Sequence, residues 1–264
     1  MIYHRRWPAL CVSRFLNKYA TLVYDLERPC VVWVGPGKGR EAIDGFFNEA
    51  LSDFQKARIR TACCDMSQAY IGAIEAPCLN ATLVLVRFHI VKALNEAVDK
   101  VRKQQWHEAT EADRKPLKGM RWLLDRHSST RTRSDTRNLK ALDKHNRRIY
   151  RAWRLKEEFE HFWTYMATWA AERFLKRWTK SALLSRLEPM RKLVNTLRKH
   201  QTAVVAFIDS RVTNAIAEGI NHIVKIVKNR ASGYRHPDAF SNMIYLAVGD
   251  LDLPEQIPAR FRTL

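Results

Sequence analysis

The sequence contains no uninterrupted apolar stretch of the roughly 18 residues that a membrane-spanning helix requires. Its five cysteines form neither a C-x-x-C pair nor a zinc-ligand spacing, so we expect reduced, buried thiols on strands. Both absences favour a cytoplasmic protein without a membrane partner. The chain of 264 residues is long enough to bury a substantial core, as one large domain or as one domain with an insertion.

Acidic residues are absent from the beginning of the chain. Neither Asp nor Glu occurs between Met1 and Tyr24, and Asp25 is the first carboxylate. The apolar segment 9–13 (ALCVS) therefore offers no carboxylate ligand to a metal ion if it forms a strand.

Positive charge is concentrated in the middle of the chain. Residues 100–199 carry 27 Lys and Arg against 11 Asp and Glu, so this stretch supplies +16 of the total net charge of +19. The same stretch holds six of the eight tryptophans, at positions 106, 122, 153, 163, 169 and 178. Lys and Arg release counterions from phosphates, so we interpret the basic residues as DNA-binding. We interpret the tryptophans as core residues of a helical region.

Strand and helix patterns alternate in the first hundred residues. The predicted strands are 19–26, 30–35, 58–64 and 81–86, and the predicted helices are 39–51 and 67–74. The first two of these strands flank a short turn and predict a hairpin. This order is typical of an α/β sheet, and the strand pattern disappears from His89 onward.

Two apolar stripes with steps of three and four residues predict amphipathic helices that pair face to face. The stripes are Leu155, Phe159, Phe162, Met166 and Trp169, and Leu183, Leu187, Met190, Val194 and Leu197. Segment 131–137 lacks apolar residues and is expected to form an exposed loop. We divide the chain into an α/β part (1–105), a basic helical insertion (106–209), a returning part (210–247) and a tail (248–264).

The returning part contains a predicted amphipathic helix. Its apolar face consists of Ile216, Ile220, Ile223 and Val227. Glu218 lies about 180° from the middle of this face, with Asn221 and Lys225 on its side of the helix. We expect the apolar face to pack on the sheet and the polar row to line a groove. The helix is expected to stop near Gly233.

Two carboxylates have settings that suit metal-dependent chemistry. Asp65 follows a buried apolar strand, and Glu218 lies on the later helix. Two-metal phosphoryl transfer needs carboxylates on rigid elements that hold two divalent ions roughly 3.5–4 Å apart. A lone glutamate on a polar helix face is usually only a solvated charge. The assignment therefore depends on the surrounding segments, which are CDMSQAY (64–70), VRFH (86–89) and TNAIAEGIN (213–221).

Together these segments resemble the catalytic domain of bacterial insertion-sequence transposases of the DDE type, specifically the ISL3 group. In that family an Asp-Met-Ser-x-x-Tyr segment holds the second catalytic Asp, and a Glu-Gly-x-Asn segment holds the catalytic Glu. The resemblance extends from about Lys18 to Leu246. It implies an α/β fold, with a ribonuclease-H-like mixed sheet flanked by helices and a large all-helical insertion before the last catalytic helix.

The resemblance also implies a function. Asp65 and Glu218 would be catalytic and would bind Mg²⁺ or Mn²⁺ in a two-metal site that cleaves DNA and transfers strands. The partner would be double-stranded DNA, both the terminal inverted repeats and the target, and the family protein would act as a homo-oligomer in the bacterial cytoplasm. The residues expected to contact DNA are Arg87, His89, Arg131, Arg133, Arg137, Asn221, Lys225, Lys228, Arg230 and Arg235. For His89, a packed structural role is an equal alternative.

The sequence departs from the family pattern in three ways. Segment 9–13 lacks the first catalytic Asp, Val86 replaces an acid, and the N-terminal zinc-binding and helix-turn-helix module is absent. Asp25 ends the following strand and is not expected to substitute. We therefore expect an N-terminally truncated or decayed copy with impaired activity. The alternatives are a non-catalytic DNA-binding protein that interferes with a full-length transposase, and another ribonuclease-H-like nuclease or integrase.

Overall fold

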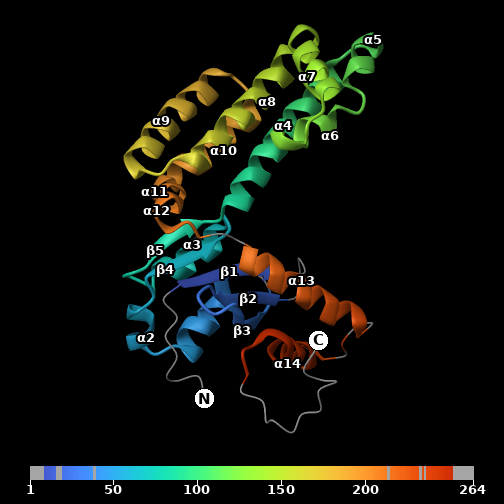
Figure 1. Ribbon diagram of the computed structural model, residues 1–264. Coiled ribbons are helices and arrows are strands. Elements are labelled where there is room, and N and C mark those ends of the chain that lie inside the picture. The colour runs from blue at the N-terminus through green and yellow to red at the C-terminus, as the bar shows by residue number, and fades with distance from the viewer. Residues whose placement is uncertain are drawn as a thin grey trace. The chain divides into compact units, whose positions relative to one another are not determined.

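The computed structural model describes residues 9–15, 20–37, 40–212, 215–231, 234 and 236–251. The chain divides into two compact units, one from residues 1–86 and 212–264 and the other from residues 87–211 (Figure 1). We call them the α/β unit and the helical unit. The boundary that the sequence placed at residue 106 falls inside a single helix, α4 (Arg87–Glu108).

The α/β unit is built on a five-stranded mixed sheet with the order β3-β2-β1-β4-β5. β2 pairs antiparallel with both β1 and β3, whereas β4 pairs parallel with both β1 and β5. The strands are β1 (Ala9–Phe15), β2 (Ala20–Asp25), β3 (Cys30–Pro36), β4 (Thr61–Cys64) and β5 (Thr82–Leu85). The predicted hairpin and the expected α/β, ribonuclease-H-like class are both confirmed.

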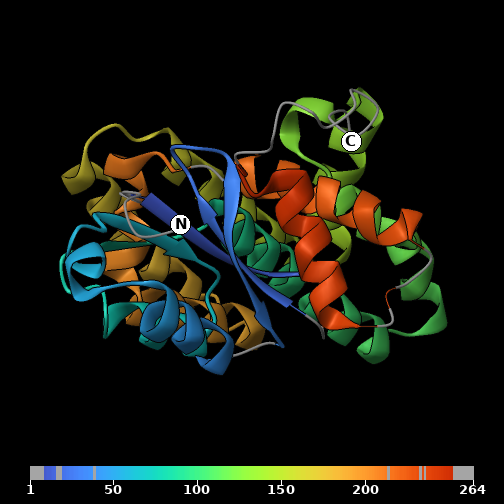
Figure 2. The same ribbon diagram turned by 90° about the horizontal axis from the view of Figure 1, so that it is seen from below.

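Helices cover both faces of this sheet (Figure 2). They are α1 (Arg40–Gly45), a π-helical turn η1 (Phe46–Ala50), α2 (Asp53–Ala57), α3 (Gln68–Glu75), α13 (Ala215–Arg230) and α14 (Pro237–Val248). Successive side chains of a strand point to opposite faces. On β2, Thr21 accordingly meets Tyr70 of α3, whereas Tyr24 meets Asn221 of α13 on the other face. Helix α2 had no sequence prediction, although Ser52 and Gln55 form a capping box at its start.

The core of the α/β unit lies around the central strands. All six residues of β2 are buried, as expected for a strand covered on both faces. All five cysteines are buried thiols, as predicted, and four of them lie on strands, whereas Cys78 lies in the turn between α3 and β5. The hydrogen bond with Cys11 and burial raise the pKa of the Cys63 thiol, which keeps this thiol protonated.

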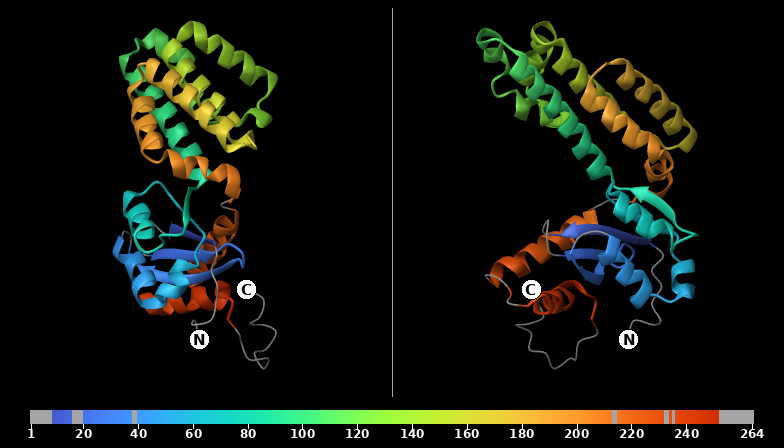
Figure 3. Two further views of the ribbon diagram at one scale, coloured as in Figure 1. Left: turned by 90° about the vertical axis from the view of Figure 1, so that its left-hand side faces the viewer. Right: turned by 180° about the vertical axis from the view of Figure 1, so that it is seen from behind.

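The helical unit contains no strand in its described residues (Figure 3). Its helices after α4 are α5 (Glu111–Arg114), η2 (Lys115–Leu117), α6 (Met120–Asp125), η3 (Ser128–Thr130), α7 (Arg133–His145), α8 (Arg147–Glu160), η4 (His161–Thr164), α9 (Thr168–Leu184), α10 (Glu188–Lys199), α11 (Gln201–Val205) and α12 (Phe207–Ser210). α4 packs against α8 and α10, and α9 packs against α8 and α10. None of the described helices is both long and apolar enough to span a membrane.

An aromatic cluster forms part of the core of this unit. Phe159 stacks on Phe162 and meets Trp178 edge to face, and the indole nitrogen of Trp178 donates to the carbonyl of Leu155 at 2.8 Å. The expectation of core tryptophans is correct for Trp163 and Trp178, which are buried. It is wrong for Trp122 and Trp169, which are 69% and 68% exposed.

The first apolar stripe was predicted to form one helix, and this is wrong beyond Phe162. The chain leaves the helix at Tyr165 and starts α9 at Thr168, so Met166 is 82% exposed. Arg211 fixes this break, because its guanidinium donates to the carbonyls of Trp163 and Tyr165. The second stripe is also divided, because Leu183 lies on α9 and is half-buried, whereas α10 begins at Glu188. Its other members, Leu187, Met190, Val194 and Leu197, are buried as predicted.

Candidate carboxylate site

Asp65 lies directly after β4, where the chain turns into α3. Its Oδ1 accepts a hydrogen bond from the backbone N–H of Ser67 at 2.9 Å, which shapes this turn. Tyr70, at the end of the same sequence motif, is buried, and its hydroxyl lies 3.0 Å from Oγ1 of Thr21 on β2. The motif therefore combines a carboxylate at the strand end with a hydroxyl that anchors α3 to the sheet.

Glu218 lies in the first turn of α13 and its side chain is exposed. The buried face of this helix consists of Ala217, Ile220, Val224 and Val227. At 100° per residue, this face is turned by about 50° from the predicted one, toward Asn221. Ile216 and Ile223 are only half-buried. The predicted apolar face is therefore partly wrong, but Glu218 and Lys225 are exposed as expected.

Asn221 is less exposed than Glu218 and Lys225, the two other polar residues on this side of α13. It is half-buried, and its Oδ1 accepts a hydrogen bond of 2.7 Å from the hydroxyl of Tyr24 on β2. This bond joins residues 197 positions apart and holds α13 on the sheet. Asn221 was expected to contact DNA, whereas this contact gives it a positioning role. Tyr24 was not among the candidate residues, and nothing in its local sequence reveals the partner.

The first strand supplies no acid to this site. β1 has the sequence ALCVSRF, and its parallel register with β4 pairs Leu10 with Ala62 and Cys11 with Cys63. Extended by two residues, this register places position 13 beside Asp65. Serine occupies position 13.

Asp25 is far from Asp65 in the register of the sheet. It pairs with Leu10 and is therefore level with Ala62, roughly 10 Å before Asp65 along the strands and two strands away. Its Oδ1 accepts the backbone N–H groups of Glu27 and Arg28 at 2.8 and 3.2 Å. Burial raises the pKa of the Asp25 carboxyl. Both the position and the contacts agree with the expectation that Asp25 does not substitute for the absent ligand.

Carboxylates are the hard oxygen donors that Mg²⁺ and Mn²⁺ prefer, so Asp65 and Glu218 are of the right chemical kind. The described residues contain no group of three His, Cys, Asp or Glu side chains that could hold a metal ion. The part of the chain that the structure describes therefore does not complete a two-metal site.

Arg87 and His89 lie in the first turn of α4, and Val86 separates this helix from β5. The guanidinium of Arg87 lies 3.4 Å from a carboxylate oxygen of Glu160 and over the ring of Trp163. The His89 ring is half-buried and lies edge to face with Phe88. These contacts give both residues structural neighbours within the helical unit.

Segment 131–137 was predicted to be an exposed loop, and this is wrong. α7 begins at Arg133, because Thr132 and Asp135 form a capping box. Arg131 donates twice to the carboxylate of Glu157, at 2.6 Å each, and lies over the ring of Trp153. Its side chain is only 9% exposed. Arg133 and Arg137, one turn apart on α7, are exposed.

The remaining predicted DNA contacts lie on or after α13. Lys225 and Arg230 are exposed and Lys228 is half-buried. Arg235 lies outside the described residues.

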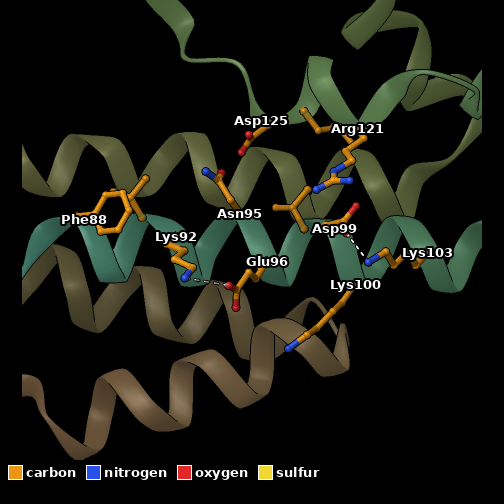
Figure 4. A pocket seen from close by; sticks show the side chains of 12 residues that line it. Phe88, Lys92, Asn95, Glu96, Asp99, Lys100, Lys103, Arg121 and Asp125 are labelled. Carbon is orange, nitrogen blue, oxygen red and sulfur yellow. Dashed lines mark ion pairs between the residues drawn. The ribbon is translucent and has the colours of Figure 1, made fainter. Parts of the chain in front are cut away.

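The helical unit also contains a pocket of about 410 Å³ between α4 and α6 (Figure 4). Basic and acidic side chains alternate along it, and Lys92 pairs with Glu96 while Lys103 pairs with Asp99. Two of its four cations are therefore paired with acids inside the pocket, which weakens their attraction for a polyanion.

Comparisons with known proteins identify the family. The family described as Transposase, the ISL3 group of DDE transposases, matches residues 13–244. The transposase for insertion sequence element IS1001 of Bordetella parapertussis is 30% identical over 227 residues, covering 85% of this chain and 56% of the relative. The transposase for insertion sequence element IS1557 of Mycobacterium tuberculosis is 24% identical over 255 residues, covering 88% and 57%. No solved structure matches.

The five-stranded mixed sheet flanked by helices places the chain in the α/β, ribonuclease-H-like class. Within that class, the chain belongs to the ISL3-group family of insertion-sequence transposases. The chain spans about half the length of the curated relatives that it matches.

Proposed function

We propose that this chain acts on DNA as an insertion-sequence transposase of the DDE type, with Asp65 and Glu218 as its catalytic carboxylates. Asp65 and Glu218 would hold divalent metal ions such as Mg²⁺ or Mn²⁺, which would supply the Lewis-acid chemistry for phosphodiester hydrolysis and strand transfer. The DNA partners would be the terminal inverted repeats of the element and the target. We further propose that cleavage by this chain is impaired.

The pairing of Asp65 with Glu218 is supported by the positions of the two elements on which these residues lie. Asp65 directly follows β4, and Glu218 lies on the exposed side of α13. α13 packs on β1, and β1 is the neighbour of β4 in the sheet. The bond from Tyr24 to Asn221 fixes α13 one turn after Glu218. Rigid elements on both sides are what a preorganised carboxylate pair requires.

The proposed impairment follows from the sequence of β1. This strand has no acidic residue, and Asp25 is level with Ala62 near the start of β4, whereas Asp65 follows the end of that strand. Two-metal catalysis depends on electrostatic stabilisation by correctly placed ions. An incomplete ligand set therefore costs several kcal/mol of barrier, which corresponds to orders of magnitude in rate.

Nicking of DNA that carries the ends of the element, in Mg²⁺ or Mn²⁺, tests both parts of the proposal. We expect little cleavage by the unmodified chain and none by Asp65→Ala or Glu218→Gln. Ser13→Asp restores an acid beside Asp65 in the register, and we expect it to increase cleavage by at least about tenfold, or 1.4 kcal/mol of barrier. The combined Ser13→Asp and Asp65→Ala variant should lose that gain.

Two results would contradict the proposal. Robust cleavage by the unmodified chain that disappears in Asp65→Ala would show that the carboxylate site is complete without an acid on β1. Cleavage that persists in both Asp65→Ala and Glu218→Gln would show that these carboxylates do not carry the reaction.

The second candidate function is DNA binding without cleavage, in competition with an active transposase. It is favoured by the charge of the helical unit, where residues 87–211 carry 30 Lys and Arg against 14 Asp and Glu. Such a protein would bind the element ends and reduce their cleavage by an intact relative. The Ser13→Asp variant would then leave cleavage undetectable.

A further inference from the structure

A second pocket of the helical unit has a different charge pattern from the one along α4. It has a volume of about 320 Å³ and lies between α8 and α9, which run antiparallel. Its lining residues are Asp143, Arg147, Tyr150, Arg151, Arg154, Leu155, Glu158 and Ser181. Three of these eight residues are arginines from a single helix.

The three arginines form a straight row on α8. Arg147, Arg151 and Arg154 are spaced by four and three residues, so they lie within about 60° of one another around the helix axis. All three are exposed, whereas Ile149 and Ala152 on the other face are fully buried. At 1.5 Å per residue, the row is roughly 10 Å long.

The charges of this row are not compensated by close ion pairs. None of the ion pairs among the described residues includes Arg147, Arg151 or Arg154, whereas the neighbouring Arg148 pairs with Glu108 of α4 at 3.3 Å. Arg151 donates to the carbonyl of Ser185 at 2.9 Å, which orients its guanidinium beside the pocket without neutralising it.

Two acids belong to the same pocket. Asp143 comes from the preceding helix α7, and Glu158 lies one turn after Arg154 on α8. Three guanidinium groups against two carboxylates leave a net positive charge. That charge lies in a unit of net charge +16, so the long-range field also attracts an anion.

We propose that this arginine row binds the phosphodiester backbone of double-stranded DNA. The guanidinium group donates two parallel hydrogen bonds to a phosphate, and phosphates of one strand follow one another at about 3.4 Å along the duplex axis. A row of roughly 10 Å therefore spans about three such steps, so each arginine can face a different phosphate of one strand. The hydroxyl of Ser181, on the opposite wall, is a further donor.

The row contacts phosphate and not base edges, so it contributes affinity without sequence preference. This role does not require the carboxylate site to be active, although it presumes the DNA substrate of the proposed function. It also moves the expected DNA surface of the helical unit from Arg131, which Glu157 neutralises, to α8.

The test is binding of the full chain to a labelled duplex of random sequence, measured by fluorescence anisotropy in EDTA at several salt concentrations. The test variant is Arg147→Gln with Arg154→Gln, which spares the Arg151 contact to Ser185. The matched control is Arg148→Gln with Lys176→Gln. It removes the same charge from α8 and α9, but Arg148 is paired and Lys176 lies away from the pocket on α9.

We expect the test variant to bind about tenfold or more weakly at 0.1 M salt and to reduce the slope of log K against log[salt] by about 1.8, because each phosphate contact contributes about 0.9. The control should change the slope by less than half of that value. Circular dichroism checks that both variants keep their helix content. Asp65→Ala should bind DNA as the unmodified chain does. The binding result therefore does not depend on whether the cleavage proposal is correct.

Three outcomes would overturn the inference. Equal losses in the test and control variants would show that only the overall charge matters. An unchanged slope in the test variant would assign the row to solvent or to an acidic protein partner. If inorganic phosphate at constant ionic strength binds the unmodified chain but not the test variant, while DNA binding is equal in both, the row is a small-anion site only.

Discussion

The two units of this protein use polar side chains in opposite ways. In the α/β unit, residues 1–86 and 212–264 carry 16 Lys and Arg against 13 Asp and Glu, a net charge of +3. Three long-range polar contacts among its described residues use uncharged hydroxyls, from Tyr24 to Asn221, between Thr21 and Tyr70, and from Val34 N–H to Tyr245. Each of these contacts fixes a helix to the sheet.

The helical unit, at a net charge of +16, uses cations as structural donors. Arg211 donates to carbonyls at the break before α9, and Arg131 donates to Glu157. Lys156 is buried and donates to the carbonyl of Leu124 at the end of α6. Net charge alone therefore overstates the number of cations available to DNA. What distinguishes a binding arginine is exposure without an acidic partner.

The largest effect is expected for Arg131→Ala in the helical unit. Removing this guanidinium leaves the partly buried carboxylate of Glu157 without its bidentate partner, so we expect a loss of about 2–3 kcal/mol of unfolding free energy. Urea unfolding followed by tryptophan fluorescence measures it, since six of the eight tryptophans lie in this unit. Arg133→Ala, an exposed neighbour, should stay within about 0.5 kcal/mol. Equal losses of unfolding free energy in the two variants would mean that Arg131 contributes no more to stability than an exposed arginine does.

A smaller effect is expected for Tyr24→Phe in the α/β unit. The substitution removes the hydroxyl that donates to Asn221 and should cost about 1 kcal/mol. A double-mutant cycle with Asn221→Ala should recover most of this energy as coupling. Tyr245→Phe, combined with the same Asn221→Ala, serves as the control and should be additive. Additive behaviour of Tyr24→Phe as well would mean that α13 is held by its apolar face alone.

The smallest effects, below about 1 kcal/mol, are expected from pH, with opposite signs in the two units. Burial lowers the pKa of Lys156 below 10.5, so the unfolded chain binds more protons in the window below 10.5 and stability rises with pH there. Burial raises the pKa of Asp25 above 3.8, so the folded chain binds more protons in the window above 3.8 and stability rises as pH falls.

Two variants isolate these contributions. Relative to Lys156→Met, the unmodified chain should gain stability between neutral pH and pH 10. Relative to Asp25→Asn, it should gain stability as the pH falls from neutral toward 4. Urea midpoints at three pH values give both differences. If both stability differences rose with pH, or both rose as the pH fell, one of the two pKa shifts would be assigned to the wrong group.

Much of the fold could be predicted from the sequence. The strands are short, apolar and bounded by turn residues, and this local pattern located β2 to β5 to within a few residues. The helical unit was less predictable. The stripe that continues to Trp169 has helical spacing on both sides of Tyr165, and only the contacts of Arg211 reveal that the chain breaks there.

The candidate site shows the same division. Asp65 and Glu218 were identified from the motifs around them, because strand-end and helix positions are encoded locally. The buried face of α13 was misplaced, because Ile, Val and Ala pack equally well on either side of a helix and the sheet selects among them. The role of Asn221 could not be predicted either, since its partner Tyr24 is 197 residues away.

By itself, the sequence determined the family, the α/β class, the placement of charge and the absence of an acid on the first strand. These properties depend on residue type and on the spacing of residues close in the chain, and both are visible in a single sequence. Only the tertiary structure decided which cations donate hydrogen bonds to carbonyls and carboxylates of the fold and which form the exposed arginine row on α8. That distinction depends on contacts between residues distant in the chain, and no local pattern encodes them.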